Sequence, residues 1–281
     1  MAMTKPTKYS LAAIAVVVIA LLGGYFGAGL RGQTASATGT SQGAWIDTIK
    51  KNGELRVGVA TSPPMTVEKD GQLGGPNLIP LQKLADELGV KLTPVAASWG
   101  NIVSGLQAGR YDVAANLNST LQRAVAIQFS DTVYDYPAVF LVPANSPYKT
   151  ADDVLAAKQP VASAAGTAEG AAAKKAGAQV LEVPDWTNAF QSLQAGRVTA
   201  EFSDLGTAQS QAQQDKSFKI IVPEKSIYKG AAAYGLPSNI DDRSKDLVNL
   251  AIYNAQISGD LDRAYEEVGY KTADQLGDLK K

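Results

Sequence analysis

The sequence contains no cysteine and no histidine. These absences exclude a disulfide framework, zinc sites built from cysteine and histidine, haem ligation through either residue, and catalysis of the Ser-His-Asp or Cys-His type. They also exclude membrane anchoring through a lipidated N-terminal cysteine. We therefore expect no metal site, no cofactor and no catalytic residues.

Neither sign of charge predominates, since 26 Lys and Arg residues stand against 27 Asp and Glu residues, for a net charge of −1. A chain without a basic excess has no electrostatic surface for nucleic acid, so no nucleic-acid partner is expected. Apolar residues make up 45% of the 281 residues. The chain is therefore long enough and apolar enough for two globular domains.

Residues 1–37 have the pattern of a targeting segment. Lys5 and Lys8 precede an uncharged, mostly apolar run over residues 10–30. Because the positive charge lies on the N-terminal side, we expect the remaining chain to be exported and to act in the periplasm or outside the cytoplasm.

Two fates of this segment stay open. The small residues Ala35-Ser36-Ala37 suit cleavage after Ala37. The apolar run is also long enough to span a bilayer, so residues 10–30 could instead remain as a membrane tether. Residues 38–50 are interpreted as a linker.

The stretch from Leu106 to Asp131 contains the first candidate site. Gly109 has the character of a residue just beyond a helix end, and residues 111–115 predict a short buried strand. Hydrogen-bonding side chains follow: Asn116, Asn118, Ser119 and Thr120. Ligands bind at the carboxyl ends of strands in open α/β sheets.

Arg123 lies three residues beyond Thr120, at the start of a predicted helical turn. Its guanidinium offers two parallel donors to a carboxylate. The alternative is a solvated arginine on a surface turn.

The pentapeptide LQAGR occurs at residues 106–110 and again at 193–197. The second copy is also followed by a predicted strand and a polar turn, which ends in Asp204. Two such units suggest two similar lobes that face each other, one with a cation and one with an anion. A ligand carrying both charges would fit between them. The alternative is chance, because LQAG is a common helix ending.

Alternating strands and helices elsewhere predict an α/β fold with a parallel sheet covered on both faces. Residues 54–59 and 90–95 predict strands, and residues 77–88 predict an amphipathic helix. Thr167 opens an alanine-rich helix, where it either caps the helix or helps to bind an anion.

The order of several motifs resembles a known family. The motifs are LRVGV followed by two prolines, ADELGVKL, SWGNIVSGLQAGRYDV, TLQR with FSD, AGTAE, LQAGRVTAEFSD and SGDLDRAYEEVGY. Over residues 54–270 the chain resembles the extracytoplasmic solute-binding proteins of polar-amino-acid ABC importers (bacterial family 3).

The resemblance implies a type II periplasmic-binding-protein fold. Its two lobes would each contain a mixed, mostly parallel sheet and be joined by two hinge strands, with crossings near residues 136–139 and 228–233. Lobe 1 would comprise residues 51–137 and 231–281, and lobe 2 residues 138–230.

The resemblance also implies the roles of five residues. Arg123, helped by Asn118 and Thr167, would bind the α-carboxylate of an amino acid. Asp204 would bind the α-ammonium group, and Trp99 would pack against the ligand side chain.

The expected side-chain pocket departs from the family pattern. Met65 replaces the usual aromatic residue, and Asn116 and Asn118 supply amides where no acid of lobe 1 is found. A cationic side chain would need a buried acid or an aromatic stack. We therefore expect a neutral or amide-bearing L-amino acid, although Trp99 or Glu201 could still accommodate a cation.

Three functions remain in competition. The first is a monomeric receptor that delivers its amino acid to ABC permease subunits and is not an enzyme. The second is a dehydratase of the prephenate or arogenate kind on the same scaffold, with Glu169 as general acid. The third is an amino-acid sensor anchored through the N-terminal segment.

Overall fold

A computed structural model describes residues 43–271 of the chain. The predicted targeting segment and the start of the predicted linker lie outside this range. None of the helices within residues 43–271 has the length and apolar character needed to cross a membrane.

Helices and strands alternate along most of the chain. The helices are α2 (Ala44–Asn52), the 3₁₀ helix η1 (Pro76–Leu78), α3 (Ile79–Leu88), α4 (Ile102–Gln107), α5 (Leu121–Ala124), α6 (Ala151–Ala156), α7 (Ala168–Lys175), α8 (Trp186–Gln194), α9 (Leu205–Gln214), α10 (Asp242–Ile257) and α11 (Asp260–Glu267). The strands are β1 (Glu54–Val59), β2 (Val67–Lys69), β3 (Gln72–Gly74), β4 (Lys91–Ala96), β5 (Val113–Asn118), β6 (Gln128–Pro143), β7 (Pro160–Ala164), β8 (Gln179–Val183), β9 (Ala200–Asp204), β10 (Phe218–Ile221) and β11 (Lys229–Leu236).

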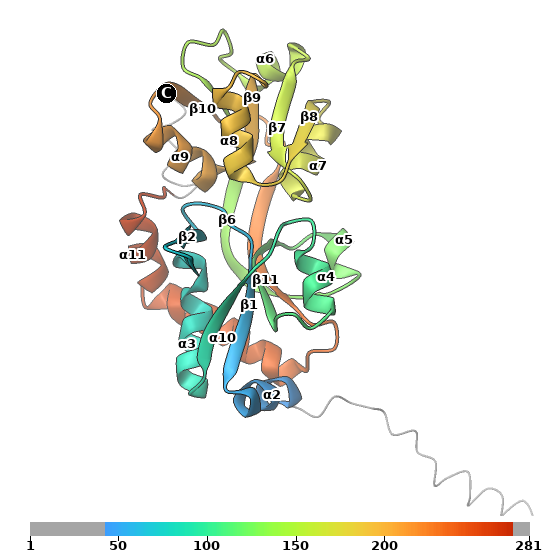
Figure 1. The fold of residues 1–281 in the computed structure, drawn as a ribbon, viewed down its shortest axis with the longest axis vertical. Coiled ribbons are helices and arrows are strands. Elements are labelled where there is room, and N and C mark those ends of the chain that lie inside the picture. Colours follow the sequence, from blue (N-terminus) through green and yellow to red (C-terminus); the bar gives the residue numbers. More distant parts are fainter. Residues whose placement is uncertain (1–42, 272–281) are drawn as a thin grey trace, which may run out of the picture. The chain divides into compact units, whose positions relative to one another are not determined.

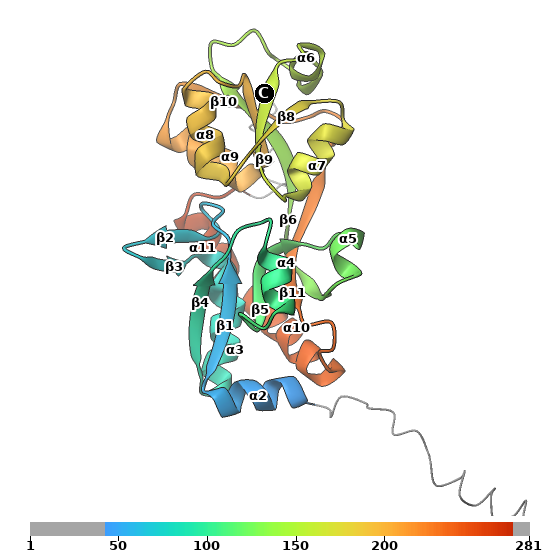
Figure 2. The same ribbon diagram turned by 45° about the vertical axis from the view of Figure 1, so that its right-hand side comes forward.

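The strand order is β4-β1-β5-β11-β6-β9-β7-β8, with β10 paired to β6, while β2 and β3 form a separate hairpin. Strand β1 is parallel to β4 and β5, and β7 is parallel to β8 and β9. The two parallel groups are connected through the antiparallel pair β6 and β11. Figures 1 and 2 show these two strands running side by side from one group of elements to the other.

We call the elements around β1, β4 and β5 lobe 1, and those around β7, β8 and β9 lobe 2. Each lobe has a mixed, mostly parallel sheet with helices beside it (Figure 1). The predicted α/β fold of two lobes joined by two strands is therefore confirmed. The residue boundaries assigned to the lobes stay a prediction.

Close packing in lobe 1 depends on two glycines beside Tyr111. A Cβ atom on Gly58 would lie 2.5 Å from the Tyr111 ring, and one on Gly105 would lie 2.2 Å from its hydroxyl oxygen. The buried hydroxyl donates a hydrogen bond to the carbonyl of Ile102. The ring thereby ties helix α4 to the sheet, and α4 begins just after Trp99.

One face of the lobe 2 sheet packs into a separate apolar core. Phe140 on β6 and Phe202 on β9 are fully buried, and their ring centroids lie 4.6 Å apart. Burial of two aromatic rings contributes several kcal/mol, of order 2–3 for each. This core fixes β9 against β6, and β9 ends at Asp204.

Two sequence predictions of local structure need correction. Residues 44–50 are not linker, because they belong to helix α2, whose Ile46 and Ile49 are buried against lobe 1. The strand predicted at residues 111–115 instead spans Val113–Asn118, so Asn116 and Asn118 lie within it. Asn116 has a φ of 55°, a conformation that asparagine tolerates better than most residues.

Candidate functional site

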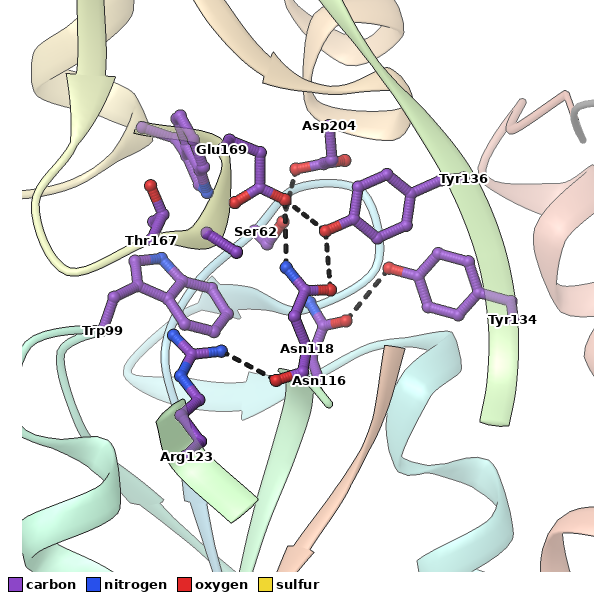
Figure 3. A pocket seen from close by; sticks show the side chains of 12 residues that line it. Ser62, Trp99, Asn116, Asn118, Arg123, Tyr134, Tyr136, Thr167, Glu169 and Asp204 are labelled. Carbon is purple, nitrogen blue, oxygen red and sulfur yellow. Dashed lines mark hydrogen bonds between the residues drawn. The ribbon is translucent and has the colours of Figure 1, made fainter. Parts of the chain in front are cut away.

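A cavity lies between the two lobes (Figure 3). It is small in this arrangement of the lobes, with about 20 Å³ of space that the centre of a water-sized sphere can reach. Its lining consists of Ser62, Trp99, Asn116, Asn118, Arg123, Tyr134, Tyr136, Thr167, Ala168, Glu169, Trp186 and Asp204.

Arg123 supplies the positive charge of this cavity. Thr120 caps the short helix α5 and accepts a hydrogen bond from the backbone N–H of Arg123. The guanidinium donates from Nη1 to the carbonyl of Asn118 at 3.1 Å and from Nη2 to the carbonyl of Gly166 in lobe 2 at 3.0 Å. Burial lowers the pKa of Arg123, yet arginine stays protonated in proteins.

Asp204 supplies a negative charge from lobe 2. It caps helix α9 and accepts hydrogen bonds from the backbone N–H of Thr207 at 2.8 Å and from its hydroxyl at 2.6 Å. Ser62 of lobe 1 donates a third bond, at 3.1 Å. Burial raises the pKa of Asp204, whereas these hydrogen bonds act in the opposite direction.

Glu169, in the first turn of α7, is a second acid in the cavity and is only 2% exposed. Its Oε1 atom accepts a 3.1 Å hydrogen bond from Nδ2 of Asn118 and also contacts the hydroxyl of Tyr136. That hydroxyl lies 2.8 Å from Oδ1 of Asn118. Burial raises the pKa of Glu169.

Aromatic and amide groups complete the lining. Tyr134 donates a 3.0 Å hydrogen bond to Oδ1 of Asn116. The indoles of Trp99 and Trp186 are largely buried, one from each lobe. The site thus combines one cation, two acids, amides and flat apolar surfaces, which suits a small polar ligand with an apolar portion.

The model of the bacterial extracellular solute-binding proteins, family 3, matches residues 55–269. The chain belongs to this family.

Curated relatives carry two kinds of name. A probable amino-acid ABC transporter-binding protein of Haemophilus influenzae is 32% identical over 62% of this chain and 69% of its own. L-cystine-binding protein TcyA of Bacillus subtilis is 32% identical over 70% of this chain and 73% of its own. Cyclohexadienyl dehydratase of Pseudomonas aeruginosa is 26% identical over 80% of this chain and 86% of its own.

A solved structure gives the same fold. The substrate-binding protein of an amino-acid ABC transporter from Streptococcus pneumoniae, bound to L-arginine, superposes with a TM-score of 0.73 at 26% identity. The match covers 80% of this chain and 97% of that one. The type II fold expected from the family resemblance is therefore confirmed.

The structure brings together six of the seven residues that the sequence placed in the site. These are Trp99, Asn116, Asn118, Arg123, Thr167 and Asp204. Their individual roles stay predictions. Thr167 caps α7, and its hydroxyl donates to the carbonyl of Ala164, so that hydroxyl has no hydrogen left for a ligand carboxylate.

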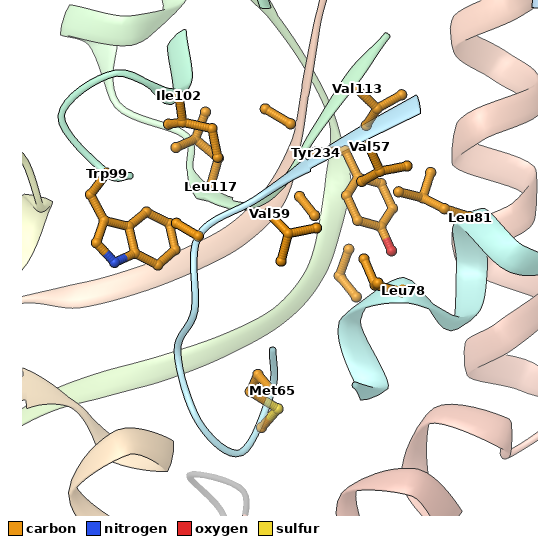
Figure 4. Packing of buried hydrophobic residues seen from close by; sticks show 14 of the residues in the cluster. Val57, Val59, Met65, Leu78, Leu81, Trp99, Ile102, Val113, Leu117 and Tyr234 are labelled. Atoms are coloured by element: carbon orange, nitrogen blue, oxygen red, sulfur yellow. The ribbon is translucent and has the colours of Figure 1, made fainter. Parts of the chain in front are cut away.

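Met65 is the exception, and its placement in the site was wrong. Both Met65 and Thr66 donate backbone hydrogen bonds to the carbonyl of Ser62, which turns the loop back on itself. The Met65 side chain is fully buried in the apolar cluster that Figure 4 shows in part. The residue from this loop that lines the cavity is Ser62.

Sequence reasoning missed several lining residues. From the sequence, Glu169 is predicted only as the general acid of the dehydratase alternative, and Tyr134 and Tyr136 are not predicted in the site. The AGTAE turn was the available signal for Glu169. Glu201, the predicted alternative partner for a cationic side chain, is fully buried and does not line the cavity.

Within residues 43–271, no three acidic side chains are grouped so that they could hold a metal ion.

Proposed function

We propose that this protein is the substrate-binding component of an ABC importer and that it binds a free L-amino acid between its lobes. The observation that carries the proposal is the pairing of Arg123 from lobe 1 with Asp204 from lobe 2 around one cavity. A guanidinium is suited to an α-carboxylate, and a carboxylate is suited to an α-ammonium group.

Relatives and the N-terminal sequence support this role. Both a curated relative and a solved structure are named as binding proteins of amino-acid ABC transporters. The predicted targeting segment suits a protein that works outside the cytoplasm and passes its ligand to permease subunits in the membrane. Attachment through residues 10–30 would limit its diffusion and would also suit a sensor.

The ligand class that we favour is a neutral or amide-bearing amino acid. Asn116 and Asn118 face the cavity and can exchange hydrogen bonds with amide or hydroxyl groups. The sequence offers no acid of lobe 1 near the side-chain pocket, and the structure adds Glu169 of lobe 2 to the lining of the same cavity. One relative is named as an L-cystine-binding protein, and one similar structure is bound to L-arginine. Both neutral and cationic amino acids therefore need to be tested as ligands.

A thermal-shift screen of the twenty amino acids tests the ligand class. A ligand at 100 times its dissociation constant stabilises a protein by about 2.7 kcal/mol. We expect the largest shift from a neutral or amide-bearing amino acid. The largest shift from arginine or lysine would contradict the neutral preference, and no shift from any amino acid would contradict the proposed function.

Calorimetry with the best ligand then tests the charge pair. Replacing Arg123 with Ala leaves a ligand carboxylate unpaired in a desolvated site, at a cost of about 3–5 kcal/mol. We expect binding to become undetectable. Arg110→Ala is the matched control, since Arg110 is exposed and outside the cavity.

Glu169 supports a second candidate function, a dehydratase of the prephenate or arogenate kind. A buried carboxyl with a raised pKa can act as a general acid, and one relative is a cyclohexadienyl dehydratase. Incubation with prephenate and arogenate, followed by assays for phenylpyruvate and phenylalanine, tests it. Turnover that disappears in Glu169→Gln would establish the enzyme and replace the receptor role.

A further inference from the structure

Three side chains form a closed hydrogen-bonded ring at the wall of the cavity (Figure 3). Glu169 Oε1 contacts Asn118 Nδ2, Asn118 Oδ1 contacts the Tyr136 hydroxyl, and that hydroxyl contacts Glu169 Oε1. Asn118 comes from β5, Tyr136 from β6 and Glu169 from α7, so the ring joins both lobes and a connecting strand. All three residues are buried.

Each of the three links in this ring needs one hydrogen. The Asn118 amide directs one hydrogen into the ring, and the Tyr136 hydroxyl carries one. If Glu169 were ionised, two hydrogens would have to serve three links. The count is the same when the Asn118 amide is turned over, because it still directs one hydrogen and one oxygen into the ring. A proton on Glu169 supplies the third hydrogen.

We propose that Glu169 is held protonated in this ring and that its proton makes the cavity select amino acids with uncharged side chains. The selectivity part of this inference rests on the proposed amino-acid-binding function. With Glu169 neutral, the charges of Arg123 and Asp204 balance, and a zwitterion with an uncharged side chain keeps that balance.

The charged and titratable groups around Glu169 act in both directions. Burial raises the pKa of the Glu169 carboxyl, and Asp204 on β9 raises it further, whereas the hydrogen bonds from Tyr136 and Asn118 act in the opposite direction. Arg123 on α5 favours ionisation, although its guanidinium hydrogen bonds go to two backbone carbonyls and none to Glu169. Tyr136 and Tyr228 are neutral, since burial raises the pKa of both phenols, that of Tyr228 to about 12.

Ionisation of Glu169 would reverse the selectivity. The cavity would then hold two carboxylates against one guanidinium, and a buried excess charge is unfavourable unless it is paired. A neutral amino acid leaves that excess unpaired, whereas a cationic side chain compensates it. Binding of a neutral ligand should therefore weaken as pH rises, and binding of a cationic ligand should release a proton.

Calorimetry from pH 5.5 to pH 9, in buffers with different ionisation enthalpies, tests the selectivity. For the wild type with its tightest neutral amino acid, we expect affinity to fall by up to tenfold per pH unit once Glu169 ionises in the free protein. Gln in place of Glu169 keeps a hydrogen at the ring position at every pH. Glu169→Gln should therefore flatten this profile, and an unchanged profile would overturn the proposed selectivity.

Infrared difference spectroscopy of the ligand-free protein tests the proton independently of any ligand. At neutral pH, the wild type should show the carbonyl stretch of a protonated carboxylic acid, and Glu169→Gln should lack this band. Glu201→Gln provides a reference for a second buried carboxyl. Loss of an ionised carboxylate band would overturn the inference, even if no amino acid bound. Binding with a wild-type pH profile in Glu169→Gln would overturn the selectivity while leaving the proposed function standing.

Discussion

Gly166 of lobe 2 lies directly against the backbone of Gly100 in lobe 1. A Cβ atom on Gly166 would be 2.7 Å from the Cα atom and 2.8 Å from the nitrogen of Gly100. The carbonyl of the same Gly166 accepts a hydrogen bond from Arg123. The lobes therefore meet at a point where a side chain of any size would hold them apart.

Replacing Gly166 with Ala should impair closure of the lobes around the ligand. Alanine at its φ of +76° costs about 1–2 kcal/mol, and the clash with Gly100 adds a cost that falls only on the closed arrangement. We expect affinity for the best amino acid to fall at least tenfold, about 1.4 kcal/mol, by calorimetry. Ligand should reduce the radius of gyration of the wild type, as measured by small-angle scattering, and it should reduce that of Gly166→Ala by less.

Gly196→Ala is the matched control for this experiment. Gly196 also has a positive φ, +66°, but no atom lies within 4 Å of its added Cβ. Gly196→Ala should lose stability as Gly166→Ala does, but it should keep the wild-type affinity for the ligand. Equal affinity and equal compaction in the two variants would contradict a closing contact at Gly166.

The buried carboxyl of Glu201 should make stability depend on pH. Burial raises its pKa to about 8, against about 4.3 for an exposed glutamate. Below the pKa of an exposed glutamate, Glu201 is protonated in both the folded and the unfolded state, and its contribution to folding stability is complete. It declines as pH rises towards 8, because only the unfolded state releases the proton, at up to about 1.4 kcal/mol per pH unit.

Glu201→Gln should therefore gain stability over the wild type as pH rises from 5 to 8. Urea unfolding at both pH values measures this gain. Glu182→Gln, an exposed position on β8, is the control and should show no such change. A Glu201→Gln curve parallel to the wild type would contradict the prediction.

Asp241 should have the opposite pH dependence. Although desolvation raises its pKa, hydrogen bonds from Ser244 and from the backbone N–H groups of Gly43 and Trp45 lower it to about 2. A depressed pKa contributes stability above the unfolded value of about 3.9 and loses it as pH falls towards 2. The bonds to Gly43 and Trp45 attach α2 to α10.

Asp241→Asn should destabilise the protein at pH 6, and the deficit relative to the wild type should narrow between pH 4 and pH 2. Denaturant unfolding monitored by circular dichroism measures both. Asp242→Asn is the neighbouring control, since Asp242 is exposed and takes no part in these bonds. A deficit independent of pH would show that the carboxylate charge is not involved.

Tyr270 should be important for stability through its ring and not through its hydroxyl. The ring lies 5.5 Å from that of Tyr265 and 6.0 Å from that of Tyr134, and it packs beside Gly206 just after Asp204. Its buried hydroxyl has no hydrogen-bond partner among residues 43–271. Thermal unfolding should show a loss of about 3 kcal/mol in Tyr270→Ala and no loss in Tyr270→Phe. Equal destabilisation in both variants would contradict this account.

Local patterns in the sequence predicted a large part of the fold. Apolar spacing and glycine positions located most strands and helices, because these signals depend on residues a few positions apart. Arg123 and Asp204 were placed opposite each other because each follows a strand within a similar unit. Helix α2 contradicts the linker prediction, although Ile46 and Ile49 already have helical spacing in the sequence.

The sequence alone determined the absence of cysteine and histidine, the charge balance, and the positions of Arg123 and Asp204 at strand ends. Only the tertiary structure decided that Glu169 meets Asn118 and Tyr136, which precede it by 51 and 33 residues. It also decided that Met65 turns into the core. These contacts depend on how β5, β6 and β7 are ordered in space and on how one loop folds back, and no local periodicity carries that information.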